Sequence, residues 1–141
     1  MQTLTAEEYG FLAELARAYR DTHLASIKQQ EGWNPRLGID ALCFQRESAE
    51  RMVGALITPS GLWLVVVPDQ AKLTAPLEET LTMALPSGSY RLVLERLPGG
   101  YEIYKRAILR DLGELDSMQE AARLAQQMMS RLMQPTPQAD A

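Results

Sequence analysis

Apolar residues recur with helical spacing near the start of the chain. They occupy positions i, i+3, i+4 and i+7, which lie on one face of an α-helix; these residues are Leu12, Leu15, Ala16 and Tyr19. Thr5 followed by Glu8 has the form of a capping box, in which each side chain satisfies a backbone N–H group at the helix start. Pro35 disfavours helical backbone angles in the residue before it. The pattern therefore predicts a helix over residues 6–29.

Three strands are predicted next. Residues 37–46 alternate weakly between two sides, which places Cys43 in the core as a small apolar residue. Residues 52–58 form the second candidate strand. Residues 62–67 are continuously apolar and rich in valine, which is typical of a strand buried on both faces. The short turns between these segments favour an antiparallel meander.

The second half of the chain repeats both kinds of pattern. Leucine and alanine at helical spacing predict a short second helix within residues 70–84. Residues 90–95 and 101–105 alternate in character on either side of a Pro-Gly-Gly turn, which predicts a hairpin. A second capping motif and an apolar stripe predict a last helix over residues 118–133.

Together these elements predict an α+β fold in the order α-β-β-β-α-β-β-α. We expect a mostly antiparallel five-stranded sheet with the helices packed on one of its faces. Residues 1–133 are expected to form a single domain, since 141 residues suit one hydrophobic core. Residues 134–141 contain two prolines and are expected to form a flexible tail.

The net charge of the chain limits which classes of partner are expected. The formal net charge of −4 argues against nucleic acid and against an anionic membrane surface, because both attract basic proteins. The polar, acidic start of the chain lacks the features of a signal peptide, and the longest apolar run is too short to span a bilayer. One cysteine excludes an internal disulfide. We therefore expect a cytoplasmic protein without membrane insertion.

The residues that carry enzyme chemistry are scarce. The chain has one histidine, His23, and one cysteine, Cys43, predicted in different elements. Metal and cofactor sites need clusters of such side chains, so we expect no metal, no cofactor and no catalytic residue. An enzyme with a dispersed active site remains a third hypothesis. Lys105, Arg106 and Arg110 are interpreted as charges that protect an edge strand from aggregation rather than as an anion site.

Three short motifs occur in a distinctive order. They are Asn34-Pro35, then Leu56-Ile57-Thr58-Pro59 before an apolar strand ending in Pro68, then Leu85-Pro86-Ser87-Gly88-Ser89-Tyr90. In order and spacing the chain resembles the HybE family of [NiFe]-hydrogenase assembly chaperones, from the first helix through Met133. It is similar to a divergent member, because Ser60 and the segment Arg106-Ala107-Ile108-Leu109 stand where members usually carry a tryptophan and a Cys-Ser-Leu segment.

The resemblance implies a cytoplasmic maturation chaperone. Its partner would be a hydrogenase structural subunit precursor, above all the small subunit with its twin-arginine export leader, which is held until assembly is complete. No catalytic residues are implied. An effector chaperone of the type III secretion kind is the alternative, since those small acidic proteins have a similar order of elements.

Candidate partner contacts combine charge and apolar surface. Glu7, Glu8 and Glu14 on the first helix could attract a basic leader. Trp33, in the loop after that helix, is a candidate aromatic anchor. Met129 lies one position off the apolar stripe of the last helix, so we expect it to be partly exposed and able to contact an apolar segment.

Overall fold

The computed structural model describes residues 3–69 and 76–135, which form two helices and six strands. In chain order these are α1 (Ala6–Ile27), β1 (Asp40–Ser48), β2 (Arg51–Thr58), β3 (Gly61–Pro68), β4 (Thr80–Leu85), β5 (Gly88–Leu97), β6 (Tyr101–Leu109) and α2 (Met118–Leu132). Every strand pairs antiparallel with its neighbours, in the sheet order β1-β2-β3-β6-β5-β4. The prediction of an α+β fold is confirmed, but the sheet has six strands rather than five.

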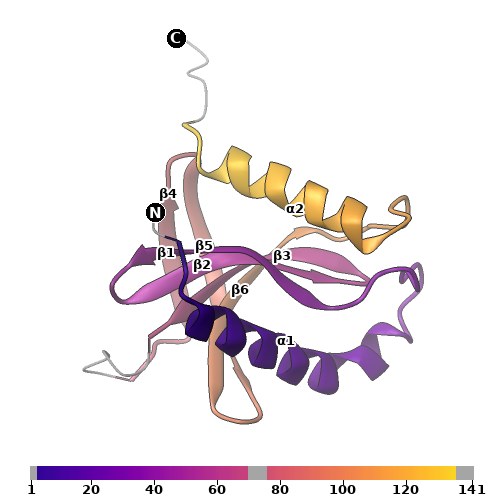
Figure 1. Ribbon diagram of the computed structural model, residues 1–141, viewed down its shortest axis with the longest axis horizontal. Coiled ribbons are helices and arrows are strands. Elements are labelled where there is room, and N and C mark those ends of the chain that lie inside the picture. The colour runs from indigo at the N-terminus through magenta and orange to yellow at the C-terminus, as the bar shows by residue number, and fades with distance from the viewer. Residues whose placement is uncertain (1–2, 70–75, 136–141) are drawn as a thin grey trace.

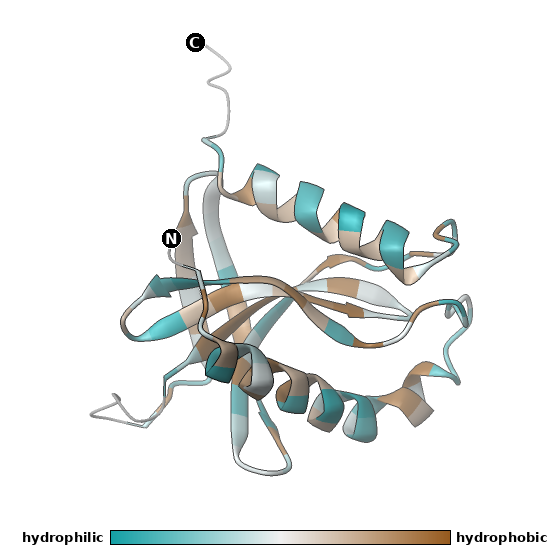
Figure 2. Cartoon of the chain, viewed as in Figure 1, coloured by the Kyte–Doolittle hydropathy of each residue, from teal (hydrophilic) through white to brown (hydrophobic). Residues whose placement is uncertain are grey.

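The two helices cover opposite faces of the sheet (Figure 1). The core beneath α1 contains Leu12, Leu15 and Tyr19, whereas the core beneath α2 contains Ala121 and Ala125. The expectation that all helices share one face is therefore wrong. Adjacent residues of the central strands alternate between these two cores, which is why β2 and β3 read as continuous apolar runs. Figure 2 shows the hydrophobic residues gathered in the strands, with mixed faces on both helices.

The predicted second helix is a strand instead. Residues 70–75 of that prediction lie outside the described residues, and Thr80–Leu85 forms β4, which pairs with β5 from Thr80↔Val93 to Leu85↔Gly88. Met83 and Leu85 are buried while Thr82 and Ala84 are exposed, which is a strand period of two. The two-residue turn at Pro86-Ser87 fixes this hairpin.

A β-bulge interrupts β1 and overturns the predicted position of Cys43. The pairing shifts between Leu42↔Ala55 and Gln45↔Val53, so Cys43 and Phe44 together oppose Gly54. Cys43 adopts a φ of 59° and is exposed, whereas Phe44 turns into the core beneath α1. The alternation predicted for this strand fails at the bulge, because an extra residue exchanges the faces that follow it.

Both predicted helix starts are present in the structure. At α1 the Thr5 Oγ1 accepts from the Glu8 N–H at 3.1 Å, and Glu8 Oε1 accepts from the Thr5 N–H at 2.8 Å. At α2 the Ser117 Oγ accepts from the Glu120 N–H at 3.2 Å, but the Glu120 carboxylate accepts from Asp116 rather than from the cap residue. The second cap is therefore only half of a capping box.

The basic residues near the end of β6 do not protect a sheet edge, because β6 lies between β3 and β5. Lys105 lies on the face of the sheet that α1 covers. Its Nζ lies 2.7 Å from Oε1 of Glu95 on β5 and 4.4 Å from the ring centroid of Trp63 on β3. Arg106 lies over the Tyr90 ring on the other face. The edge-strand interpretation of this cluster is therefore wrong.

Candidate functional site: an acidic cleft at the start of α1

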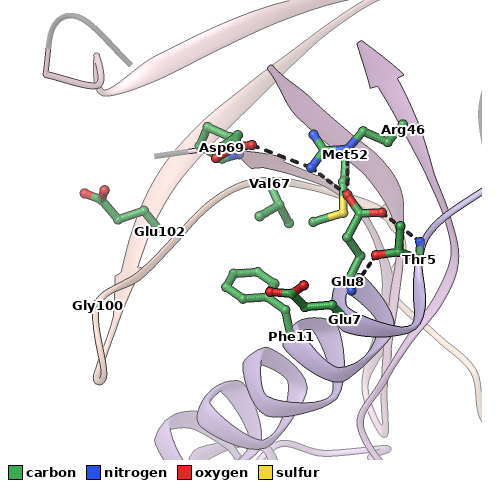
Figure 3. Close-up of a pocket in the computed structure, with 11 residues that line it drawn as sticks. Thr5, Glu7, Glu8, Phe11, Arg46, Met52, Val67, Asp69, Gly100 and Glu102 are labelled. Atoms are coloured by element: carbon green, nitrogen blue, oxygen red, sulfur yellow. Dashed lines mark hydrogen bonds and ion pairs between the residues drawn. The ribbon is translucent and has the colours of Figure 1, made fainter. Parts of the chain in front are cut away.

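A cleft of about 420 Å³ opens beside the first turns of α1 (Figure 3). Its lining comes from α1 and its cap residue, from β1, β2 and β3, and from β6 and the turn before it. The lining residues are Thr5, Glu7, Glu8, Phe11, Arg46, Met52, Val67, Pro68, Asp69, Gly100 and Glu102. The curled sheet brings these segments together from distant parts of the sequence.

Apolar side chains form part of the cleft surface. Met52 and Val67, from the neighbouring strands β2 and β3, belong to the core beneath α1 and also line the cleft. Phe11 is 41% exposed, and its ring stacks at a tilt on Tyr101 with 5.4 Å between the ring centroids. A large aromatic side chain left this exposed beside a cleft offers surface to an apolar partner.

Carboxylates dominate the charge of the cleft. Among the described residues, four carboxylates line it, namely Glu7, Glu8, Asp69 and Glu102, against one guanidinium, that of Arg46. Glu102 is also paired outside the cleft lining, since its Oε2 accepts from Arg96 Nε at 2.8 Å. Acidic groups concentrated around an apolar surface attract a ligand that combines positive charge with apolar side chains. The composition of the cleft therefore selects a class of ligand, a basic and partly apolar segment.

Glu8 is already engaged within the protein. Its Oε2 accepts from Arg46 Nε at 2.7 Å and lies 2.6 Å from Arg46 Nη2, while Asp69 Oδ2 lies 3.6 Å from the same Nη2. The Thr5 N–H and Arg46 hold the pKa of Glu8 below its usual value. Glu8 therefore fastens α1 to β1 and stays ionised, and its charge reaches a ligand mainly through the field of the cleft.

Glu7 is differently placed. It is exposed and points into the cleft, and no hydrogen bond or ion pair joins it to another residue of the described ranges 3–69 and 76–135. Phe11 and Glu14 follow at i+4 and i+7, so they share its helix face. Glu14 lies outside the cleft lining and pairs with Arg17 at 3.4 Å. Of the three predicted glutamates, Glu7 is the one best placed to contact a ligand directly.

The other two predicted contacts lie elsewhere. Trp33 is half-buried in the loop beyond the far end of α1, where Lys28 Nζ lies 6.0 Å from its ring centroid. Because α1 has 22 residues, this loop is roughly 33 Å from the cleft. Met129 is buried in the core beneath α2, on the opposite face of the sheet, so the expected partial exposure is not observed.

Sequence reasoning missed the apolar part of the site. Phe11 falls outside the buried stripe of α1, yet it stands one turn after Glu7 on the exposed face. That pairing of an aromatic and an acid was the one signal the sequence offered. Met52 and Val67 looked like ordinary strand residues, and only the tertiary structure places them at the cleft.

The three sequence motifs serve the architecture, and Pro68, which ends the strand after the second motif, also lines the cleft. Asn34 is 3% exposed, and its N–H donates to the Pro59 carbonyl at 2.7 Å, which joins the first two motifs. Its side-chain amide donates to the carbonyls of Leu112 and Leu115. Ser87 of the third motif donates its N–H to the Leu132 carbonyl, fastening the end of α2.

The described residues offer neither a metal-binding cluster nor a membrane-spanning helix. Within residues 3–69 and 76–135, no group of three or more His, Cys, Asp or Glu side chains is placed to hold a metal ion. None of the helices described has the length and apolar character needed to cross a bilayer.

The fold and the cleft define a small α+β protein with a helix on each face of one antiparallel sheet and an acidic cleft at the start of α1. Over residues 11–141 the chain matches the family described as [NiFe]-hydrogenase assembly, chaperone, HybE, and it belongs to that family. The prediction of family membership is thereby confirmed. No curated protein matches the chain.

A solved structure shares the fold. The solution structure of HybE from Escherichia coli superposes with a TM-score of 0.58 at 21% sequence identity. The match covers 70% of this chain and 62% of that one, so it spans less than two thirds of the Escherichia coli protein. The comparisons give no support to the type III secretion alternative.

Proposed function

We propose that this protein is a cytoplasmic hydrogenase maturation chaperone that holds the precursor of the small subunit, through its twin-arginine leader, until assembly is complete. Membership of the HybE family supports the assembly role. The single observation that carries the choice of ligand is the cleft at the start of α1, where four carboxylates surround an apolar surface.

The proposed binding mode follows from the two halves of such a leader. Its arginines would lie near Glu7, in the negative field that Asp69 and Glu102 extend across the cleft. An apolar side chain beside the arginines would rest on Phe11 and Met52. Arginine contributes orientation as well as charge, because its planar guanidinium can bond a carboxylate through two N–H groups.

The residues predicted to contact the partner have different roles in this arrangement. Glu7 would touch the leader, Glu8 would act through its charge, and Glu14 would extend the acidic face of α1 for a longer segment. Trp33 lies too far away for the same peptide and would contact another part of the precursor. Met129 would support the fold beneath α2.

A direct test measures the affinity of a synthetic leader peptide by fluorescence anisotropy at fixed salt. Glu7→Lys reverses a charge inside the cleft and should raise the Kd about tenfold or more. Glu31→Lys makes the same charge change in the exposed loop after α1 and should alter the Kd less than twofold. Equal effects of the two variants would mean that the cleft is not the binding site.

The identity of the partner needs a second experiment. The tagged protein is recovered from hydrogenase-expressing cells, and the bound proteins are identified by mass spectrometry. A small-subunit precursor that still carries its leader is the expected result. Recovery of the large-subunit precursor alone would mean that the chaperone acts on the large subunit instead. Recovery of secretion effectors would favour an effector chaperone of the type III secretion kind.

A further inference from the structure

Among the residues that the structure describes, strand β4 forms an edge of the sheet without the usual protection. Its six residues, Thr80–Leu85, include no charged residue and no proline, and its register with β5 is unbroken. The opposite edge, β1, carries two register shifts and three charged residues, Asp40, Arg46 and Glu47. Bulges and charges are the common devices that prevent edge-to-edge pairing, so their absence from β4 leaves an edge that is able to pair with another strand.

The hydrogen-bond pattern identifies which backbone N–H and C=O groups of β4 point away from β5. Leu85 and Gly88 flank a two-residue turn, and the Leu94 N–H donates to the Glu79 carbonyl at 2.9 Å. Residues at odd-numbered positions therefore face β5, because the direction of the backbone groups alternates along an antiparallel strand. It follows that Thr80, Thr82 and Ala84 direct their N–H and C=O groups outward.

We propose that this edge pairs with β4 of a second copy of the chain, antiparallel, with the two-fold axis at Thr82. In that register Thr82 faces Thr82 of the second copy, and Thr80 faces Ala84 on either side. All the outward backbone groups of the strand are then satisfied, and the two sheets become one continuous sheet. An isologous contact of this kind closes the assembly at a dimer.

Side chains suit the same register. Thr82 would lie beside its own copy, and threonine pairs across strands are favourable. Leu81 would face Met83 of the second copy, on the face of the sheet that α2 covers, so apolar meets apolar. Glu78 and Glu79 of the two copies would lie at opposite ends of the paired strands, which avoids repulsion. Self-pairing thus buries no charge at its centre.

The full chain should sediment as a dimer at tens of micromolar in analytical ultracentrifugation. Thr82→Pro removes the central outward donor from each copy and should weaken the dimer on the order of 100-fold. Proline is tolerated where an edge N–H faces outward, so the variant should still fold, which circular dichroism would verify. Thr82→Val keeps the backbone donors and should leave the dimer intact.

Cross-linking tests the register. In a Cys43→Ser background, which removes the exposed native cysteine, Thr82→Cys should form a disulfide dimer in mild oxidant. The expected Cα separation of about 5.5 Å lies in the disulfide range. Ala84→Cys should not cross-link, because the two copies of residue 84 would stand roughly 14 Å apart.

Three outcomes would overturn the proposal. They are a monomeric chain at 100 µM, an unchanged dimer in Thr82→Pro, and equal cross-linking of the two cysteine variants. If the chain were monomeric and Thr82→Pro lowered the affinity for a precursor, the edge would bind a client strand instead of a second copy. None of these outcomes depends on the cleft, so the dimer and the leader site can fail separately.

Discussion

At the scale of single residues, Asn34 shows how one buried amide can join two loops, its own and the loop between β6 and α2. Its Nδ2 donates to the carbonyls of Leu112 at 2.9 Å and Leu115 at 2.8 Å, and its Oδ1 accepts from the Arg36 N–H at 2.9 Å. Asn34→Ala leaves two carbonyls without a donor and should lower the free energy of unfolding by about 2–4 kcal/mol. Urea denaturation measures this loss.

Asn34→Asp serves as the matched variant, because it keeps the size and the acceptor but loses the donors. A carboxylate facing two carbonyl oxygens should destabilise the protein at least as much as alanine does. A loss below about 0.5 kcal/mol for both variants would show that the amide is not a structural tie.

Gly54 is required by a close approach rather than by its backbone angles. A Cβ at this position would lie 2.4 Å from the Phe44 ring and 2.8 Å from the Phe44 Cα. Gly54→Ala should therefore cost about 2–3 kcal/mol, since the bulge that places Phe44 here must shift. The double variant Gly54→Ala with Phe44→Ala should cost less than the sum of the single variants. Simple additivity in urea denaturation would contradict the contact.

At the scale of elements, local pattern predicted most of the fold. Both helices and five of the strands follow from spacing, caps and turns, because each signal lies within a few residues. β4 was misread because Leu77, Leu81 and Ala84 fit a helical period as well as Leu81, Met83 and Leu85 fit a strand. Pairing with β5 decides between the two patterns, and that pairing is information from outside the segment.

The ion pair between β5 and β6 links these strands to α1. Lys105 Nζ lies 2.7 Å from Glu95 Oε1 and donates to Tyr19 Oη at 3.0 Å, while His23 contacts the other oxygen of Glu95. Burial raises the pKa of Glu95, but Lys105 and His23 outweigh it, and the pKa falls below the ordinary 4.5. For Lys105, burial lowers the pKa and its two partners more than compensate, so the pKa rises above 10.5.

The directions of these two pKa shifts determine how the free energy of unfolding should depend on pH. A lowered folded-state pKa means that the contribution of Glu95 is present above pH 4.5 and is lost as pH falls towards the folded value. A raised pKa means that the contribution of Lys105 is lost only as pH rises past 10.5. Glu95→Gln should therefore cost about 1–2 kcal/mol at pH 7 and progressively less below pH 4.5. Urea denaturation at pH 7 and pH 3.5 measures both values, and a constant difference would contradict the assignment.

At the scale of the whole molecule, the sheet carries a helix on each face, and its curl creates the cleft. The start of α1 lies beside the turn between β5 and β6, where Gly99 and Gly100 adopt φ values of 89° and 83°. The sequence identified Glu7 and Glu8 because they are local to one helix. It could not identify Met52, Val67 and Glu102 as their neighbours, because three separate strands must first fold together.

The charge of the molecule yields the last prediction. The net charge of −4 and the four carboxylates of the cleft should steer a basic leader peptide towards its site. Screening shortens the electrostatic range from about 10 Å at 0.1 M salt to about 3 Å at 1 M. The association rate constant should fall about tenfold over that range, with a much smaller change in the dissociation rate constant. Stopped-flow fluorescence measures the association rate, and competition with unlabelled peptide measures the dissociation rate. A peptide with both arginines replaced by leucine should bind more slowly and with almost no salt dependence. If the two peptides showed equal salt dependence, the arginines would not be the groups that the acidic cleft attracts, and apolar contact with Phe11 would have to account for the encounter.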